Sequence, residues 1–357
     1  MDPSLFEDND RQAARPDGRK YAEVGALDCE CGQPLPSVTI AYETWGELNA
    51  DKSNAILVCH ALSGDSHAVG WWDRIVGVGK AIDTDKYFVI GSNCLGGCQG
   101  SSGPTINHKD GKPWGSRFPL VTIGDMVECQ IRLVRSLGIE TLLGVCGGSM
   151  GGMQALEWSR RGSVRKVWTT GCCKAHTAMQ IAFNEIGREA IMRDPKWRGG
   201  DYPQDDPPTD GLAIARMVGH LSYLSDASFE HKFARRFQDK EKQDWTLDTE
   251  FEVESYLSYQ AEKFTKRFDP NSYLVLTRAL DYYDCRSLQG SKSEYLFTSF
   301  TSDWLYPSYQ SRELLAMAQK AGCTAQHFEI DLPYGHDAFL LDAEQQGAAA
   351  SAFFGAD

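Results

Sequence analysis

The sequence predicts an α/β fold: a mainly parallel β-sheet covered by helices and interrupted by a helical lid. Three observations lead to this prediction. Short, nearly continuous apolar runs recur along the chain, as expected for parallel strands that are buried on both faces. Segments with a helical period separate these runs, and one long middle stretch has helical patterns only. The chain has 357 residues, 42% of them apolar, so it can bury a large core.

The expected strands begin after an N-terminal arm at residues 1–20. Residues 21–27 and 38–44 are predicted to form an antiparallel pair around the turn-like sequence CGQPLP. Buried parallel strands are expected at residues 55–59, 87–90, 142–146, 166–169 and 293–299. Apolar side chains at a 3.6-residue period predict a helix over residues 122–137, and Gly138 ends it.

The middle of the chain breaks this alternation. Helical patterns at residues 178–192, 212–223 and 250–264 each carry an apolar stripe, and a loop rich in Pro, Gly and Asp follows the first of them. We therefore expect a core made of residues 1–173 and 288–357, with a helical lid at residues 174–287. A lid placed over the carboxyl ends of parallel strands would cover a ligand site.

Composition and charge limit the possible partners. The 36 Lys and Arg residues are outnumbered by 49 Asp and Glu residues, which gives a net charge of −13 without a basic stripe. We therefore expect a small-molecule partner, and neither nucleic acid nor a membrane. No apolar run approaches the roughly 20 residues of a membrane span, and the acidic start does not resemble a signal peptide, so a cytoplasmic location is expected. The 11 cysteines lack zinc-site spacing and are expected to be reduced, mostly buried thiols.

A candidate nucleophile lies in the segment LLGVCGGSMGGMQALEW at residues 142–158. It combines a strand, a glycine-rich turn and a helix, and it contains Gly-x-Ser-x-Gly centred on Ser149. A sharp turn of this kind exposes the serine hydroxyl, and the glycines let neighbouring elements approach closely. The alternative is a tight turn without a catalytic role, or a phosphate-binding loop that lacks its lysine.

A serine nucleophile needs a histidine base, and the histidine needs a carboxylate to orient it. In parallel-sheet enzymes with this turn, the order along the chain is Ser, then Asp or Glu, then His. Asp303 follows the strand at residues 293–299, and His336 lies in a loop near the C-terminus. These two residues complete the predicted triad. Other histidines, at positions 108, 176 and 231, lie in loop or lid segments without this context.

Two backbone N–H groups are also expected to form an oxyanion hole. One would come from Met150, directly after the nucleophile, and the other from Leu62, in the loop after the strand at residues 55–59. The same loop contains His60 and His67, which we interpret as polar packing because no matching carboxylate spacing indicates a metal site. We therefore expect neither a metal nor a bound cofactor.

Nine sequence blocks add to this pattern. They lie at residues 41–49 (AYETWGELN), 60–67 (HALSGDSH), 70–72 (GWW), 93–104 (NCLGGCQGSSGP), 147–154 (GGSMGGMQ), 181–185 (IAFNE), 211–217 (GLAIARM), 251–260 (FEVESYLSYQ) and 334–339 (YGHDAF). In this order they resemble the α/β-hydrolase-fold homoserine O-acyltransferases, and most closely the O-acetyltransferases among them. The resemblance covers nearly the whole chain.

The resemblance implies a ping-pong acyl transfer. Ser149 would take an acyl group from acyl-CoA, which is a co-substrate, and the hydroxyl of an amino acid would then attack the acyl-enzyme. By the same resemblance, Arg216, Tyr223 and Asp337 would bind the carboxylate and ammonium groups of L-homoserine. The resemblance also implies a role in methionine biosynthesis and a homodimer formed through the lid.

The choice of substrates stays open between related alternatives. Asp65, Gln99 and Met150 are similar to the acetyl-using members, and an anionic Asp65 near the acyl pocket would disfavour succinate, so we expect acetyl-CoA over succinyl-CoA. The short segment at residues 67–71 and the unusual GCCKAH at residues 171–176 leave serine as an alternative acceptor.

Two alternatives belong to other classes of protein. An esterase-type hydrolase has little use for the zwitterion-binding Arg216 and Asp337, and a non-catalytic binding protein would have lost a triad member. Because CoA is strongly anionic, we also expect a local cluster of positive charge at the mouth of its tunnel.

Overall fold

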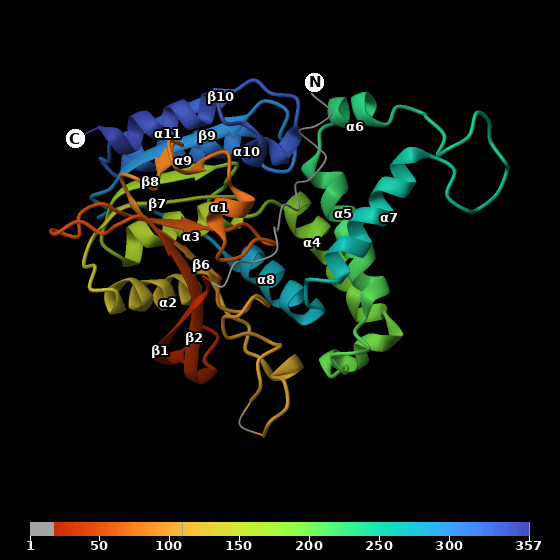
Figure 1. Ribbon diagram of the computed structural model, residues 1–357, viewed down its shortest axis with the longest axis horizontal. Coiled ribbons are helices and arrows are strands. Elements are labelled where there is room, and N and C mark those ends of the chain that lie inside the picture. Colours follow the sequence, from red (N-terminus) through yellow and green to blue (C-terminus); the bar gives the residue numbers. More distant parts are fainter. Residues whose placement is uncertain (1–17, 109, 357) are drawn as a thin grey trace.

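One eight-stranded sheet forms the centre of the molecule (Figure 1). The computed structural model describes residues 18–108 and 110–356, so most of the predicted N-terminal arm lies outside the described residues. The strand order is β1-β2-β6-β3-β7-β8-β9-β10. The strands are β1 (Lys20–Asp28), β2 (Pro34–Trp45), β3 (Ala55–Cys59), β6 (Phe88–Ser92), β7 (Leu142–Gly148), β8 (Val164–Thr170), β9 (Glu294–Phe300) and β10 (Ala325–Ile330).

The register confirms the predicted α/β class. β1 pairs with β2 and β2 with β6 in antiparallel fashion, and every pair from β6 through β10 is parallel. β2 begins inside the predicted turn, because Pro34 and Leu35 already pair with Asp28 and Leu27. A separate two-stranded sheet of β4 (Val76–Gly77) and β5 (Ile82–Asp83) was not predicted.

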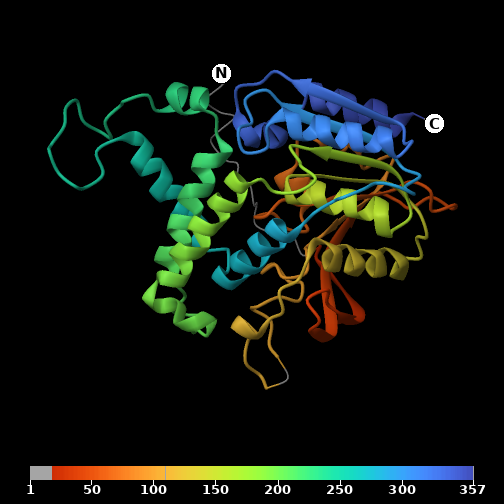
Figure 2. The same ribbon diagram turned by 180° about the vertical axis from the view of Figure 1, so that it is seen from behind.

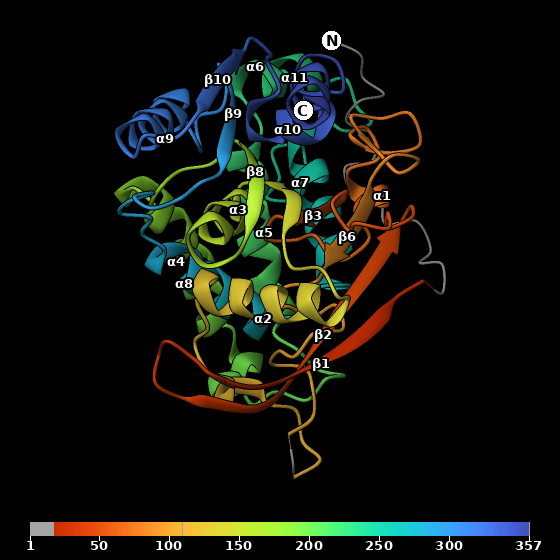
Figure 3. The ribbon, with the colours of Figure 1, turned by 90° about the vertical axis from the view of Figure 1, so that its left-hand side faces the viewer.

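Helices cover both faces of the central strands (Figure 3), as the continuous apolar runs predict. In β3, Leu57 and Cys59 belong to one core cluster, while Ile56 and Val58 belong to another. The first cluster lies under α2 (Ile123–Ser136), α3 (Met150–Arg161) and α9 (Ser308–Lys320). The second lies under α1 (Ala68–Trp71), α10 (Ala338–Leu341) and α11 (Gln345–Gly355). The sheet is therefore the middle layer of three.

Helix α2 forms where the sequence predicts a helix, because both its N-terminal cap and its apolar face are present in the structure. Thr122 caps its N-terminus, because its side chain accepts from the Asp125 N–H and the Asp125 carboxylate accepts from the Thr122 N–H. The apolar face packs on the sheet, and Gly138 follows the C-terminus. The predicted span of residues 122–137 is confirmed to within a residue at each end.

Five helices lie between β8 and β9 and stand beside the core (Figures 1 and 2). They are α4 (Ala178–Arg193), α5 (Thr209–Tyr223), α6 (Asp226–Lys232), α7 (Glu252–Thr265) and α8 (Pro270–Tyr282). The predicted helices correspond to α4, α5 and α7. We refer to these five helices as the lid. Helices α6 and α8 were not predicted, although Ser225 and Asp269 cap them with side-chain acceptors.

The cysteines, the helix lengths and the turn after β10 can each be compared with the sequence. All 11 cysteines are free, and eight of them are buried. Among the described residues, no helix combines the length and the apolar character needed to cross a membrane. The 3₁₀ turn at Gly335–Asp337 follows β10 and carries two of the predicted site residues.

The close contact between α3 and β3 generates a stability prediction. A Cβ added at Gly151 would overlap the backbone carbonyl oxygen of Cys59, which cannot move without disturbing β3. We expect Gly151→Ala to lower the free energy of unfolding by about 1–3 kcal/mol, the usual cost of overpacking a core. Urea unfolding followed by circular dichroism measures this change.

Gly347→Ala in α11 is the matched control. Its Cβ would meet only the Ile75 and Ala81 side chains, at 3.7 and 3.9 Å, which is ordinary contact. Because alanine favours helices over glycine by about 1 kcal/mol, this variant should be as stable as the wild type or more so. Equal stabilities of the two variants would contradict the proposed steric constraint.

Candidate active site

Ser149 occupies a strained turn between β7 and α3. Its backbone has φ 55° and ψ −121°, a conformation that non-glycine residues seldom adopt. The turn is held because the Ser149 N–H donates to the Thr170 carbonyl at 3.1 Å. An added Cβ at Gly147 would lie 2.5 Å from the Cys59 carbonyl oxygen, so this position requires a residue without a side chain. The structure thus forms the turn that the Gly-x-Ser-x-Gly pattern predicts.

Asp303 and His336 meet at the ends of β9 and β10. His336 Nδ1 lies 2.7 Å from Asp303 Oδ2, and the two side chains are 4% and 0% exposed. The other carboxylate oxygen of Asp303 accepts the N–H groups of Leu305 and Tyr306, at 3.0 and 2.8 Å. This carboxylate therefore holds the His336 proton on Nδ1 and leaves Nε2 as the basic nitrogen. Nε2 is buried and has no hydrogen-bond partner among the described residues.

Gly171 and Tyr306 pack against this pair. Gly171 has φ +51°, and a Cβ there would come within 3.2 Å of the His336 ring. The Tyr306 ring stacks on the His336 ring with centroids 4.7 Å apart and planes inclined by 22°. The Gly171 backbone and the Tyr306 ring thus together restrict the orientation of the His336 ring.

A partly open cavity of about 490 Å³ begins at Ser149. Leu62, Tyr223 and Tyr306 contribute to its wall, together with side chains from the lid. The other polar lining residues are His176, Gln180, Asn184, Ser222 and Tyr273. Because the cavity contains the Ser149 hydroxyl and these polar side chains, it suits a small polar substrate.

The predicted oxyanion-hole residues lie close to Ser149. Met150 is the first residue of α3, so its N–H has no acceptor within the helix. Leu62 lies in the loop after β3 and shares the cavity wall with Ser149. Two backbone N–H groups near a helix N-terminus suit a developing negative charge.

The three predicted substrate-binding residues form a group around Tyr223. The Tyr223 ring lies 6.2 Å from the His336 ring, and the Arg216 guanidinium lies over the rings of Phe264 and Tyr223, at 4.6 and 5.9 Å. Burial raises the pKa of Tyr223, the positive charge of Arg216 opposes this rise, and the negative charge of Asp337 adds to it. Both charged groups are therefore close to Tyr223. Among the described residues, however, only Tyr223 of the three lines the cavity itself.

Comparisons with known proteins identify the family. A homoserine O-acetyltransferase of Methanosphaerula palustris is 52% identical over 343 residues, which span 91% of this chain and 70% of the relative. This chain belongs to the homoserine O-acetyltransferases. A family profile for the alpha/beta hydrolase fold matches residues 54–343, so the family's acyltransferase site is built on that fold.

Solved structures agree with this assignment. The crystal structure of homoserine O-acetyltransferase from Bacillus anthracis is 26% identical with a TM-score of 0.88, and the match covers 95% of this chain and 98% of that one. The crystal structure of esterase E22 is 28% identical with a TM-score of 0.86, over 94% of this chain and 99% of that one. Acyltransferases and an esterase thus share this architecture.

In this acyltransferase, the two histidines of the loop after β3, His60 and His67, have structural contacts. The ring nitrogens of His60 lie 2.7 Å from the Ala61 carbonyl and 3.0 Å from the Cys94 N–H, and burial lowers the pKa of His60. His67 Nδ1 lies 2.7 Å from Glu43 Oε2. Within residues 18–108 and 110–356, no group of three His, Cys, Asp or Glu side chains is placed to hold a metal ion.

Asp65 and Gln99, which the sequence relates to the choice of acyl donor, lie outside the wall of the cavity. The Asp65 carboxylate accepts the His67 N–H at 2.8 Å, and the Gln99 amide donates to the Arg267 carbonyl at 2.6 Å. Neither residue belongs to the described lining of the cavity. The argument from the charge of Asp65 against succinate therefore has no direct geometric support.

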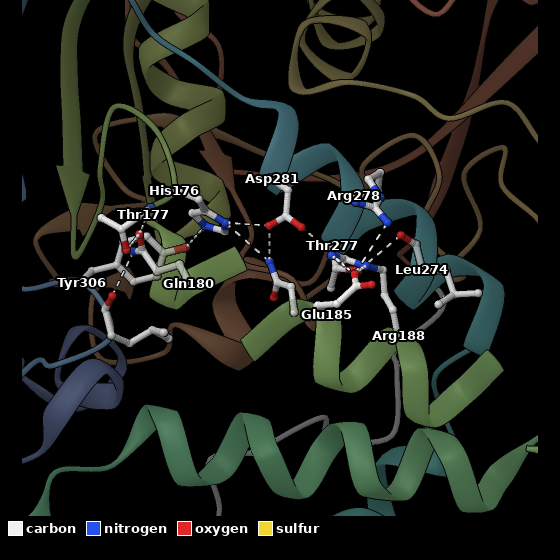
Figure 4. Close-up of polar contacts among 12 residues, drawn as sticks. His176, Thr177, Gln180, Glu185, Arg188, Leu274, Thr277, Arg278, Asp281 and Tyr306 are labelled. Atoms are coloured by element: carbon white, nitrogen blue, oxygen red, sulfur yellow. Dashed lines mark hydrogen bonds and ion pairs between the residues drawn. The ribbon is translucent and has the colours of Figure 1, made fainter. Parts of the chain in front are cut away.

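The sequence analysis missed a second buried His–Asp pair. His176 Nδ1 lies 3.0 Å from Asp281 Oδ1, and His176 Nε2 lies 2.8 Å from the Tyr306 hydroxyl (Figure 4). His176 was set aside as a histidine without context, because its partner is 105 positions away. The only sequence signal was the unusual segment at residues 171–176. Of the other two histidines set aside, His231 is exposed and His108 lies 3.7 Å from Asp110.

His220 in the lid provides a prediction about pH. Its ring is buried beside Tyr256, and its Nε2 has no hydrogen-bond partner among the described residues. Burial, followed by the nearby positive charges of Arg216 and Lys232, lowers the pKa of His220 to about 2. In the unfolded chain its pKa is about 6.5. Acid below pH 6.5 therefore protonates the unfolded state first and destabilises the fold.

We expect His220→Gln to reduce the loss of stability in acid. Between pH 7 and pH 5, the free energy of unfolding of this variant should fall by about 2 kcal/mol less than that of the wild type. Urea titrations at several pH values measure the difference. His231→Gln, at an exposed position, is the control and should keep the wild-type dependence. Parallel curves for His220→Gln and the wild type would contradict a neutral buried His220.

Proposed function

We propose that this protein transfers an acetyl group from acetyl-CoA to the hydroxyl of L-homoserine through an acyl-enzyme on Ser149. The observation that carries the proposal is the combination of two features in one site. A strained serine adjoins a buried His336–Asp303 pair, and the charges of Arg216 and Asp337 act on Tyr223, which lines the same cavity as Ser149. The name of the relatives supports the same reaction.

In the first half-reaction, the Ser149 oxygen attacks the thioester carbonyl while His336 Nε2 accepts the serine proton. The Met150 and Leu62 N–H groups stabilise the resulting oxyanion. The carbon–sulfur bond then breaks, and His336 returns the proton to the CoA thiolate. Asp303 stabilises the histidine cation that exists between these two proton transfers.

In the second half-reaction, His336 takes the proton of the acceptor hydroxyl. The acceptor oxygen attacks the acyl-enzyme, the ester bond to Ser149 breaks, and His336 returns the proton to Ser149. Arg216 would bind the acceptor carboxylate, Asp337 its ammonium group, and Tyr223 would lie between them. No step needs a metal or a resident cofactor, and acetyl-CoA acts as a co-substrate.

The wider biological role is part of the same proposal. O-acetylation of homoserine would belong to methionine biosynthesis and take place in the cytoplasm. A homodimer through the lid is supported by apolar side chains that α4 and α5 expose, among them Ile186 and Ile214, which are 52% and 50% exposed. Succinyl-CoA as donor and serine as acceptor are the alternatives within this reaction class.

An esterase is the second candidate function, favoured by the similarity to esterase E22. Both reactions use the same serine, base and oxyanion hole, and they differ in whether water or an amino acid attacks the acyl-enzyme. Arg216 and Asp337 distinguish them, because a pair of opposite charges matches a zwitterion and offers nothing to water.

The central test is Ser149→Ala. Acetyl transfer to homoserine should fall by at least about 10⁴-fold because no acyl-enzyme can form, while circular dichroism should show an unchanged fold. Acetyl- and succinyl-CoA are each assayed with homoserine, serine and water, and released CoA and O-acylated product are both quantified. Retained transfer by the variant, or CoA release without O-acylated product in the wild type, would refute the proposal.

Arg216→Ala tests the acceptor site separately. Loss of a charge-assisted hydrogen bond worth about 1.5–3 kcal/mol should lower kcat/KM for homoserine by roughly 10- to 100-fold, mainly through KM. The single-turnover rate of acylation by acetyl-CoA should stay within about twofold, because this residue does not contact the donor chemistry. Arg193→Ala, at a cation 81% exposed on the same lid, is the matched control. An unchanged KM for homoserine in Arg216→Ala would exclude this role.

A further inference from the structure

Two tyrosine hydroxyls in the wall of the Ser149 cavity have no partner in the protein. Most polar side chains that line this cavity already form hydrogen bonds with other residues. The hydroxyls of Tyr223 and Tyr273, in contrast, form no hydrogen bond with any residue within 18–108 and 110–356. A buried tyrosine usually places its hydroxyl against a hydrogen-bonding group, so these two hydroxyls indicate that a ligand supplies the partner. The lining side chains that do have partners are those of His176, Gln180, Asn184, Ser222 and Tyr306.

The Tyr273 hydroxyl lies between two other helices of the lid. Tyr273 belongs to α8 and is 7% exposed, and a Cβ added at Gly187 of α4 would lie 2.6 Å from its hydroxyl oxygen. The same point is 3.2 Å from the Cβ of Ala215 in α5. Gly187 is about one helical turn from the lining residue Asn184, and Ala215 is about one turn from the lining residue Gly219. The hydroxyl therefore lies where α4, α5 and α8 meet at the cavity.

The charged groups at this site give an amino acid a direction. Asp337 lies in the 3₁₀ turn of the core that also holds the base, so an ammonium group that binds Asp337 lies on the core side. Arg216 belongs to the lid helix α5, and its guanidinium lies 5.9 Å from the centre of the Tyr223 ring. A carboxylate on the same carbon atom as the ammonium group would therefore point toward the lid, where Arg216 and the Tyr273 hydroxyl are.

The Tyr273 hydroxyl is a hydrogen-bond donor at neutral pH. Burial raises the pKa of Tyr273 above its usual value, so the hydroxyl keeps its proton. A hydrogen bond to a charged acceptor is stronger than one to a neutral acceptor, and the carboxylate is the charged acceptor of an amino acid. Because a carboxylate has two oxygens, it can accept from an arginine and from tyrosine hydroxyls at the same time.

We propose that the Tyr273 hydroxyl donates a hydrogen bond to the carboxylate of the amino-acid acceptor, beside Arg216 and Tyr223. This role rests on the proposed function, because it concerns the acceptor of the same acyl transfer. Tyr273 binds the acceptor and takes no part in the acylation of Ser149. An amino alcohol or water leaves the hydroxyl without a partner, so Tyr273 makes the site selective for acceptors that carry a carboxylate.

Tyr273→Phe tests this role, because it removes the hydroxyl and keeps the ring. Two analogues that compete with L-homoserine separate the parts of the contact: L-2-aminobutyrate has the carboxylate without the hydroxyl, and 3-amino-1-propanol has the hydroxyl without the carboxylate. In Tyr273→Phe, the KM for homoserine and the Ki of L-2-aminobutyrate should rise roughly 10- to 100-fold, as expected for loss of a hydrogen bond to a charged group. The Ki of 3-amino-1-propanol should stay within about twofold. An unchanged Ki for L-2-aminobutyrate, or equal rises for both analogues, would overturn the proposal.

Tyr283→Phe is the matched control. Tyr283 is also 7% exposed, and its hydroxyl has no hydrogen-bond partner among the described residues. It lines a different hollow, beside Glu157 and Arg160. This variant should therefore keep the wild-type KM and both wild-type Ki values.

A purely structural role of Tyr273 would be visible in the stability of the enzyme without substrate. Because the hydroxyl has no partner in the described part of the protein, Tyr273→Phe should be at least as stable as the wild type in urea unfolding. Its single-turnover acylation by acetyl-CoA should stay within about twofold, and lower stability or slower acylation would contradict a role limited to the acceptor. If the wild type itself forms no O-acetylhomoserine, the proposed function is wrong; if it does, and Tyr273→Phe keeps its Ki for L-2-aminobutyrate, only the role of Tyr273 fails.

Discussion

The whole site depends on how closely the turn at Ser149 approaches the end of β3. Gly147 and Gly151 both face the Cys59 carbonyl oxygen, and neither position has room for a Cβ. This contact brings the N-terminus of α3 next to the loop after β3, where Leu62 lies. The strained backbone of Ser149 and the closeness of the Met150 N–H to the loop that contains Leu62 follow from the same approach. One steric constraint thus determines where the proposed nucleophile and the proposed oxyanion hole can be.

The lid joins the core beside the His336–Asp303 pair. Ala175 and Asp284 form a β-bridge where the lid leaves and re-enters the core, and the Cys285 N–H donates to the Lys174 carbonyl at 2.8 Å. His176 and Asp281 lie just inside this joint, next to Tyr306. Any displacement of the lid would therefore change the surroundings of Tyr306, whose hydroxyl lies 2.8 Å from His176 Nε2 and whose ring stacks on His336. The position of the lid and the orientation of the His336 ring are thus physically coupled.

The parts predicted from the sequence are those with local signals. Parallel strands appear as apolar runs, and Ser149 has its glycines beside it, so both could be recognised without a structure. The His176–Asp281 pair has no such signal, because its members are 105 positions apart and meet only through the folding of the lid. Asp65 is a different case. Its position in the loop after β3 suggests a place near the acyl group, whereas its carboxylate accepts the His67 N–H and is not among the residues that line the cavity.

The net charge of −13 does not conflict with an anionic donor, because the charges are unevenly distributed. Four cations lower the pKa of His220: Arg216 on α5, Lys232 on α6, Lys263 on α7 and Arg267, which follows α7. They concentrate positive charge around His220 in the lid, and the Arg267 guanidinium donates to the Ser63 carbonyl in the loop after β3. A local field of this kind attracts phosphate groups at distances within a Debye length, whereas the acidic surface elsewhere is screened by salt. His220 stays neutral mainly because it is buried, and a positive charge at its position would in addition be repelled by all four cations.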